Sequence, residues 1–351
     1  MTKPTNPTSQ TSPTNDLLRP SAPLGVIRAG SRTAEQIAGH SRTALDRPLA
    51  HPGELWVAVS RDSALTWGAF QRTDTRPGAP ALAPRLRRAS GGPAVALGEG
   101  TVHVALALAH PGAIVPCDEK RIANRYVRPL LRALTKAFPR GAQVATPGAQ
   151  AHFFGGDWVD MLHRPVAWVG FAHDAASRRT LFEAFVAVRV PFAEGGRAAF
   201  RGKAPATLDE LAGATLDPYR IAEAIVDAYA AVSGGSPATA PTPETTPETT
   251  PPDEVPPDDV RDPPWAATIE EAIGIVAAGP DARGVFRVGG DLLVSRDALA
   301  RLEGRIAAGD DPGRAVDEAL AAPGVAIDGV RSLTSVRDVI VRAKDPRSVH
   351  L

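Results

Sequence analysis

The chain has 351 residues, of which 43% are hydrophobic and 22% are charged, with 39 basic and 39 acidic side chains. A formal net charge of zero excludes the strong basic field that nonspecific nucleic-acid binding needs, and it gives no reason to expect a membrane partner. The single cysteine, Cys117, excludes an intramolecular disulfide and a multi-cysteine metal site.

Residues 1–20 are rich in proline, threonine, serine and asparagine, and they contain too little apolar surface to offset the entropy of ordering. We therefore predict a disordered tail. The same stretch has no apolar segment of the kind found in secretory signals, and the chain has no apolar run of about 18 residues. With one cysteine, these features predict a cytoplasmic protein without a transmembrane helix.

Residues 21–233 form the predicted main domain, in which strands and helices are mixed. Apolar residues at helical spacing predict helices at 31–44, 119–138 and 218–232. Apolar or alternating runs predict strands at 54–60, 64–71, 93–96, 101–108, 157–162, 166–173 and 180–191. Trp158 and Trp168 fall in two of these strands and are predicted to pack in the core.

A linker and a small second piece follow the main domain. Residues 234–264 contain the near-repeat TPETTPETTPPDEVPPDD, whose prolines favour an extended chain and whose acids keep it solvated. Residues 265–351 have enough leucine, isoleucine and valine for a modest core. Predicted helices in this piece are 268–278, 295–307, 312–321 and 332–343, and 284–293 is strand-like.

The stretch most informative about function is RRASGGPAV, residues 87–95. A glycine pair between a basic, hydroxyl-bearing turn and a strand lets backbone N–H groups approach an anion closely. Arginine adds a charged fork that fits phosphate or carboxylate. Such a loop suits an acyl-adenylate, and the alternative is a tight turn with two surface arginines.

The surroundings of this loop add three further motifs in a fixed order. The segments ELWVAVS and WGAFQR precede it, with Gly68 and Gln71 in the second, and TVHVALAL follows it. Further on stands GGDWVDMLHRPVAWVGFAHD, a strand, a basic hairpin turn and a strand. With these features, residues 50–230 resemble the catalytic domain of the lipoate–protein ligase and biotin–protein ligase family. The segment GGDLLVSRDALARLEGRI is similar to the start of the accessory domain in lipoate ligases.

The resemblance implies an α/β (α+β) fold, in which helices flank a mixed β-sheet and a small C-terminal accessory domain follows. It implies that lipoate or octanoate reacts with ATP and Mg²⁺ to give acyl-AMP, and that a lysine of a lipoyl domain or other carrier protein then takes the acyl group. It implies no tightly bound cofactor and no protein-bound metal. The residues carried over to the acyl-adenylate site are Arg87, Arg88, Ser90, Gly91, Gly92, Ala94, Val95 and Gly170.

Three departures from the family pattern concern the chemistry. Pro93 replaces the third glycine of the loop and removes one N–H donor. Residues 96–101 lack the polar His, Asp and Asn that often follow the loop in the family. The hairpin reads HRPVA, so Pro165 stands where the family has a charge-stabilising lysine. Arg164 is the predicted substitute cation, whereas Lys203, just before the closing helix, does not fit the pattern.

These departures leave three hypotheses open. The chain is a ligase with a rearranged site, or a noncatalytic ligase-fold protein that binds an acyl-adenylate or a partner, or an octanoyl transferase with Cys117 as nucleophile. An open cationic groove at the loop favours the first hypothesis, and a groove plugged by Leu97 and Trp168 favours the second. His152, His163 and His173 are predicted to be exposed loop residues rather than metal ligands.

Overall fold

The computed structural model describes residues 24–72, 85–138, 150–192, 199–234, 238–239 and 263–345. The predicted tail at 1–20 lies outside these ranges, as does most of the predicted linker at 234–264. Two residues of that linker, Ala238–Thr239, form the short strand β11, which pairs in parallel with the first strand of the main sheet.

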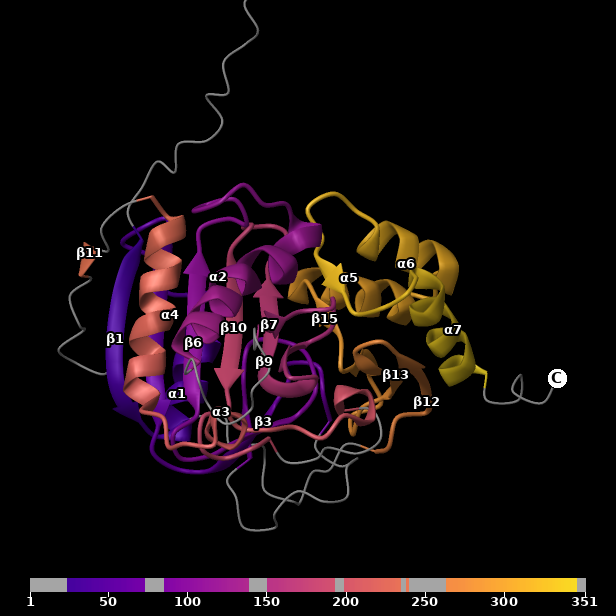
Figure 1. Ribbon diagram of the computed structural model, residues 1–351. Coiled ribbons are helices and arrows are strands. Elements are labelled where there is room, and N and C mark those ends of the chain that lie inside the picture. The colour runs from indigo at the N-terminus through magenta and orange to yellow at the C-terminus, as the bar shows by residue number, and fades with distance from the viewer. Residues whose placement is uncertain are drawn as a thin grey trace, which may run out of the picture.

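An eight-stranded mixed sheet forms the centre of the molecule (Figure 1). Strands β11, β1 and β2 are parallel, and every later neighbour in the sheet is antiparallel. The predicted mixed sheet flanked by helices is therefore confirmed. In spatial order the strands are β11, β1 (Gly25–Arg32), β2 (Gly53–Ser60), β6 (Val102–Leu108), β10 (Thr180–Val186), β9 (Arg164–His173), β8 (Trp158–Met161) and β7 (Ala151–His152).

Two long helices cover one face of this sheet, α2 (Ile122–Ala137) and α4 (Pro218–Val232) (Figure 1). Helix α4 begins where its sequence predicts, because the Asp217 carboxylate accepts from the Tyr219 N–H at 3.0 Å and proline takes the first helical position. The two helices are joined by the Tyr229 hydroxyl, which donates to the Tyr126 carbonyl at 2.6 Å. A 3₁₀ turn, η2 (Glu119–Arg121), leads into α2.

The opposite face of the sheet is covered by α1 (Ala34–Thr43) and by a second, three-stranded sheet. Thr33 and Gln36 form a capping box at the start of α1, so the predicted helix at 31–44 begins later than expected and follows the unpredicted strand β1. The short elements of this region are β3 (Ala64–Trp67), β4 (Arg85–Arg87), β5 (Val95–Leu97) and η3 (Ala199–Gly202), whereas α3 (Leu208–Ala212) packs into the core on the side of α2 and α4.

The C-terminal residues have a hydrophobic core of their own. A three-stranded sheet, a two-stranded sheet and three helices surround it (Figure 1). The elements are β12 (Ala267–Glu271), β13 (Gly274–Pro280), β14 (Phe286–Gly290), β15 (Leu293–Val294), α5 (Arg296–Ala307), α6 (Pro312–Leu320), β16 (Ile327–Asp328) and α7 (Leu333–Lys344). No helix within the described ranges is long and apolar enough to cross a membrane.

The predicted helix at 268–278 is wrong, because this segment forms the hairpin of β12 and β13. Gly274 opens β13 with φ of 132°, a conformation that L residues rarely adopt. A Cβ atom there would lie 2.1 Å from Oδ2 of Asp291. Half-buried and exposed residues alternate along β12, and β13 is buried along most of its length, so the apolar spacing of the segment does not mark the face of a helix.

Candidate functional site

The RRASGGPAV loop joins β4 to β5, so both of its ends are fixed in the small sheet. Val95 is buried and begins β5, where its carbonyl accepts from the Thr66 hydroxyl at 2.9 Å. Ala94 is half-buried beside it. The small sheet therefore places the loop over the face of the main sheet that lies opposite α2 and α4.

Arg88 is 1% exposed, and its guanidinium is hydrogen-bonded to the loop itself. It donates to the Ser90 hydroxyl at 3.1 Å, and to the carbonyls of Gly91 at 2.8 Å and Pro93 at 2.6 Å. A further bond of 3.1 Å reaches the Thr66 carbonyl. Burial lowers the pKa of Arg88 to about 10, against the raising influence of nearby carboxylates, so the group stays charged at neutral pH.

The charge of Arg88 faces a buried carboxylate network. Glu183 on β10 is fully buried and accepts from the Ser90 hydroxyl, and its Oε1 lies 2.7 Å from Nε2 of His103 on β6. Burial alone would raise the pKa of Glu183, but the bonds from His103 and Ser90 and the charge of Arg88 hold it below its usual value. Arg88, Ser90, Glu183 and His103 thus form one polar network under the loop.

The glycine N–H groups of the loop donate to the chain itself. Gly91 donates to the Phe171 carbonyl of β9 at 3.2 Å, and Gly92 donates to the Leu292 carbonyl of the C-terminal region at 3.1 Å. A Cβ atom on Gly91 would lie 1.9 Å from that Leu292 oxygen. The Leu292 carbonyl therefore occupies the space that the glycine pair leaves open, and no anion fits there in this arrangement.

Trp168 of β9 occupies the space beneath the loop. The side chain is fully buried, and the guanidinium carbon of Arg88 stands 4.0 Å from its ring centroid. A Cβ atom on Gly92 would lie 2.8 Å from this ring, and one on Gly170 would lie 2.4 Å from it. Both glycines make room for Trp168. Leu97 is also buried in the same apolar cluster, so both residues expected of a plugged groove are in the core.

Arg87 borders the outer side of the loop and is half-buried. One of its terminal nitrogens donates to the carbonyls of Gly68, Ala69 and Gln71, at 3.1, 3.1 and 2.9 Å. It lines an open hollow of about 290 Å³ between the small sheet and the C-terminal region. Arg72, on the same hollow, stacks on Trp265 at 3.6 Å, so the cations here also hold the two parts of the chain together.

A pair of buried carboxylates, Asp157 and Asp291, lies where the C-terminal region meets the loop. The Gln71 side chain donates to Asp291 at 2.6 Å, and Asp157 accepts from the Trp168 indole at 3.2 Å. Asp157 is 2% exposed. Burial, with the negative charge of Asp291 second, raises the pKa of Asp157 to about 7. This carboxyl is therefore partly protonated at neutral pH.

The hairpin between β8 and β9 places Arg164 against the segment that leads into α3. Its guanidinium forms an ion pair with Glu210 and donates to the Pro205 carbonyl at 2.8 Å. About one third of the side chain is exposed. Arg164 remains a predicted site residue, but in this structure it binds Glu210 and the Pro205 carbonyl, which hold it against the segment before α3.

Lys203 is a residue of this region that the sequence did not reveal. Its ammonium forms an ion pair with Asp160, whose Cα is paired across the hairpin with that of Pro165. Asp160 is 1% exposed, and its second oxygen has no hydrogen-bond partner among the described residues. A lysine from 43 residues further along the chain thus reaches the strand opposite Pro165. Local motif spacing contains no signal for such a contact.

Cys117 lies just before η2 on the side of α2, and its thiol donates to the Asp118 carbonyl at 3.2 Å. Burial, followed by the charge of Asp118, raises the pKa of the Cys117 thiol to about 12. A thiol in this state is a poor nucleophile at neutral pH, which counts against the transferase hypothesis. His173 is fully buried and bonds to Thr180 and to the Gly324 carbonyl, so its prediction as an exposed loop residue is wrong.

Comparison of the sequence with known protein families and with curated proteins gives no match. Comparison with solved structures finds several ligases. P. falciparum LipL1 in complex with lipoate has a TM-score of 0.44 and 10% identity, and the match covers 60% of this chain and 62% of that one. Lipoate-protein ligase A bound with ATP has a TM-score of 0.43 and 12% identity, over 62% of this chain and 87% of that one. Biotin protein ligase from Leishmania major with biotin has a TM-score of 0.35 and 12% identity, over 76% and 98%.

Proposed function

We propose that this chain is a noncatalytic ligase-fold protein, which works by binding a partner and does not activate an acid with ATP. The observation that carries this proposal is that the loop is closed by the chain itself. Arg88 and the N–H groups of Gly91 and Gly92 all donate to protein atoms, and Trp168 fills the space under them.

An acyl-adenylate would have to displace a fully buried tryptophan and would compete with the Leu292 carbonyl for the Gly92 N–H. Leaving buried polar groups unpaired costs on the order of 1–3 kcal/mol each. A closed loop with all these groups satisfied is therefore favoured over an open loop in which they lack partners, and this supports the noncatalytic proposal.

The second candidate is a lipoate–protein ligase that acts on lipoate or octanoate and on a carrier-protein lysine. The sequence resemblance over residues 50–230 favours it, and so does the lysine that reaches the hairpin. In that case the C-terminal region would move from the loop before substrates bind, and Arg164 or Lys203 would supply the missing cation. Cys117-dependent transfer comes third, because the thiol is held protonated.

The deciding experiment combines calorimetry with a nonhydrolysable lipoyl- or octanoyl-adenylate mimic and ATP–pyrophosphate exchange with each acid. We expect neither binding nor exchange for the unaltered chain. Exchange with either acid would overturn the noncatalytic proposal, and Arg164→Ala and Lys203→Ala would then identify the cation.

A matched pair of variants tests whether Trp168 closes the loop. Trp168→Gly removes the ring from beneath Arg88, whereas Trp158→Gly removes a buried ring that packs on Phe200. We expect mimic binding to appear only in Trp168→Gly. If the mimic binds neither variant while both remain folded by circular dichroism, the loop is not a latent adenylate site.

A further inference from the structure

The outer face of α2 carries a row of cations that no feature of the loop explains. Their spacing of three or four residues puts them on one side of the helix, and the helix contains no aspartate or glutamate. At 1.5 Å per residue the row extends over about 22 Å. The cations, here called the α2 basic face, are Arg121, Arg125, Arg128, Arg132 and Lys136.

Most of these charges lack ion-pair partners. Among the described residues Arg121 approaches Asp118 at 3.6 Å, and the other four cations form no ion pair with a described residue. Helices of the C-terminal region differ, since Arg301 pairs with Asp297 at 2.7 Å and Arg314 with Glu318 at 3.0 Å. In a chain of zero net charge, the α2 basic face is thus a local concentration of positive charge in which four of the five cations form no ion pair with a described residue.

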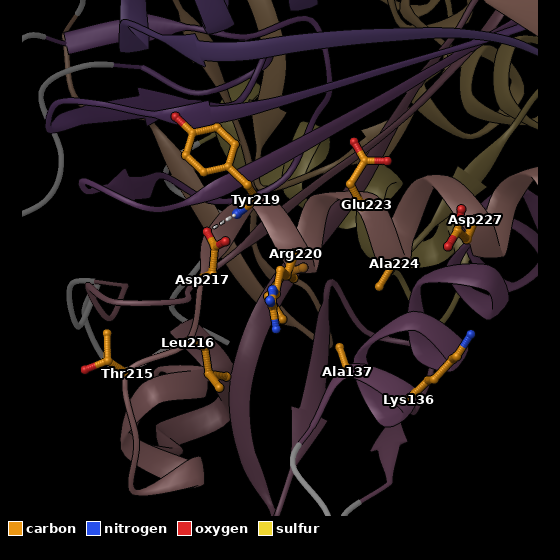
Figure 2. Close-up of a pocket in the computed structure, with 11 residues that line it drawn as sticks. Lys136, Ala137, Thr215, Leu216, Asp217, Tyr219, Arg220, Glu223, Ala224 and Asp227 are labelled. Atoms are coloured by element: carbon orange, nitrogen blue, oxygen red, sulfur yellow. Dashed lines mark hydrogen bonds between the residues drawn. The ribbon is translucent and has the colours of Figure 1, made fainter.

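The surface is hollowed at both ends of the helix. At the N-terminal end, Cys117, Arg121, Arg125 and Arg128 line a hollow of about 430 Å³. At the C-terminal end an open hollow of about 840 Å³ separates α2 from α4. Figure 2 shows Lys136 on one side of this hollow and Arg220 on the other, together with the acidic side chains of Asp217, Glu223 and Asp227. The hollow that suits an acidic partner is therefore the one at the N-terminal end of the row, where the charged lining is mostly arginine.

We propose that the α2 basic face docks the acidic surface of a partner protein. Charge complementarity selects carboxylates as the opposing groups. A lipid surface fits less well, because the apolar side of α2 is buried in the core and no large apolar side chain of this helix is exposed. Nucleic acid fits less well because the chain has no net positive charge. The face lies across the main sheet from the loop, so the proposal does not depend on whether the loop is catalytic.

Binding of three labelled probes to the full chain tests the proposal. The probes are a poly-L-glutamate peptide, a short DNA duplex, and lipid vesicles that contain phosphatidylserine. One variant carries Arg121→Ala, Arg128→Ala and Arg132→Ala. The control variant carries Arg301→Ala, Arg314→Ala and Arg337→Ala, three exposed and ion-paired arginines on α5, α6 and α7, so it loses the same charge.

We expect the peptide to bind the unaltered chain more tightly than the other probes do. The α2 variant should raise its Kd at least about tenfold, since three of the charges that define the face are lost, and the control should change it less than about twofold. Equal loss in both variants, no peptide binding, or tighter binding of duplex or vesicles would overturn the proposal. A triple arginine-to-lysine variant that retains binding would confirm that charge, and not an altered fold, is responsible.

Discussion

At the residue scale, two buried ionisable groups, Arg88 and Asp157, contribute to the stability of the closed loop. Arg88 donates five hydrogen bonds to atoms of the loop and of β3, and Asp157 accepts from the ring on which Arg88 stacks. The protonation state of each group depends on its buried neighbours. Replacing either group should therefore change the free energy of unfolding by an amount that can be measured.

Replacing Arg88 by alanine should destabilise the fold strongly. The change removes the positive charge near the buried Glu183 and the hydrogen bonds that Arg88 donates to the carbonyls of Thr66, Gly91 and Pro93. Breaking such a buried charge network costs about 3–5 kcal/mol. Urea denaturation measures the change in the free energy of unfolding. Arg85→Ala is the matched control, because Arg85 is exposed on β4, the strand that leads into Arg88, and its loss should cost less than about 0.5 kcal/mol. Equal stability of the two variants would show that the Arg88 network contributes little.

Asp157 should make stability fall as pH rises. Its pKa of about 7 in the folded chain exceeds the value of about 3.9 in an unfolded one. Between these values the folded state binds more protons, so the free energy of unfolding decreases with increasing pH. Asp157→Asn removes this effect, and we expect its stability relative to the unaltered chain to increase steadily from pH 4 to pH 7. A constant difference across that range would contradict the raised pKa.

At the scale of elements, the contact between the loop and β15 depends on the absence of a single side chain. The Leu292 carbonyl precedes β15 and fits against Gly91 only because no Cβ atom is there.

Elements whose sequence signals lie within the element itself were predicted correctly. Helix α4 has the bounds that its apolar spacing predicted, because its capping residue, its first proline and its apolar spacing all lie within or next to the helix. Strand β1 was missed because its pairing partner β2 lies beyond α1 in the chain. The hairpin β12–β13 was misread although its strands are neighbours, because the apolar spacing of so short a segment fits either a helix or a pair of strands.

Gly91→Ala should loosen the contact between the loop and the C-terminal region. The new methyl group would meet the Leu292 oxygen at 1.9 Å, so backbone atoms must shift. We expect a lower Tm and faster amide exchange in β15. Gly304→Ala is the control, since Gly304 lies within α5 with nothing within 4 Å of its added Cβ. That variant should gain up to about 1 kcal/mol through helix propensity. A Gly91→Ala protein as stable as the Gly304→Ala protein would mean that the loop yields easily.

At the scale of the whole molecule, the C-terminal region is attached by more than the chain that leads to it. Arg72 donates to the Gly279 carbonyl at 2.9 Å, Gly290 donates to the Phe70 carbonyl at 2.9 Å, and the Gly92–Leu292 bond lies between the two parts. The sequence predicted a separate small piece after a linker. It could not predict that this piece covers the glycine loop, because the two segments lie about 200 residues apart and no motif records their contact.

Cutting the chain at an engineered protease site after Thr249, inside the predicted linker, should leave two folded pieces that stay together. The contacts around Arg72 and Gly92 persist after the cut, so we expect one peak by size-exclusion chromatography at micromolar concentration. The same cut in the Gly91→Ala protein should give two peaks. Separation of the unaltered pieces would show that the covalent connection, and not the interface, holds the regions together.

The position of Cys117 gives the protein an internal chemical reporter. The chain has one thiol, and this thiol lines the hollow at the N-terminal end of α2. Because the thiol stays protonated at neutral pH, its alkylation by a maleimide should be slow enough to follow by mass spectrometry. Any molecule bound at that end of the helix would slow the alkylation of Cys117 further. The assay therefore needs neither a dye nor a substitution. The rate of alkylation therefore measures occupancy in the natural sequence, even in a crude mixture.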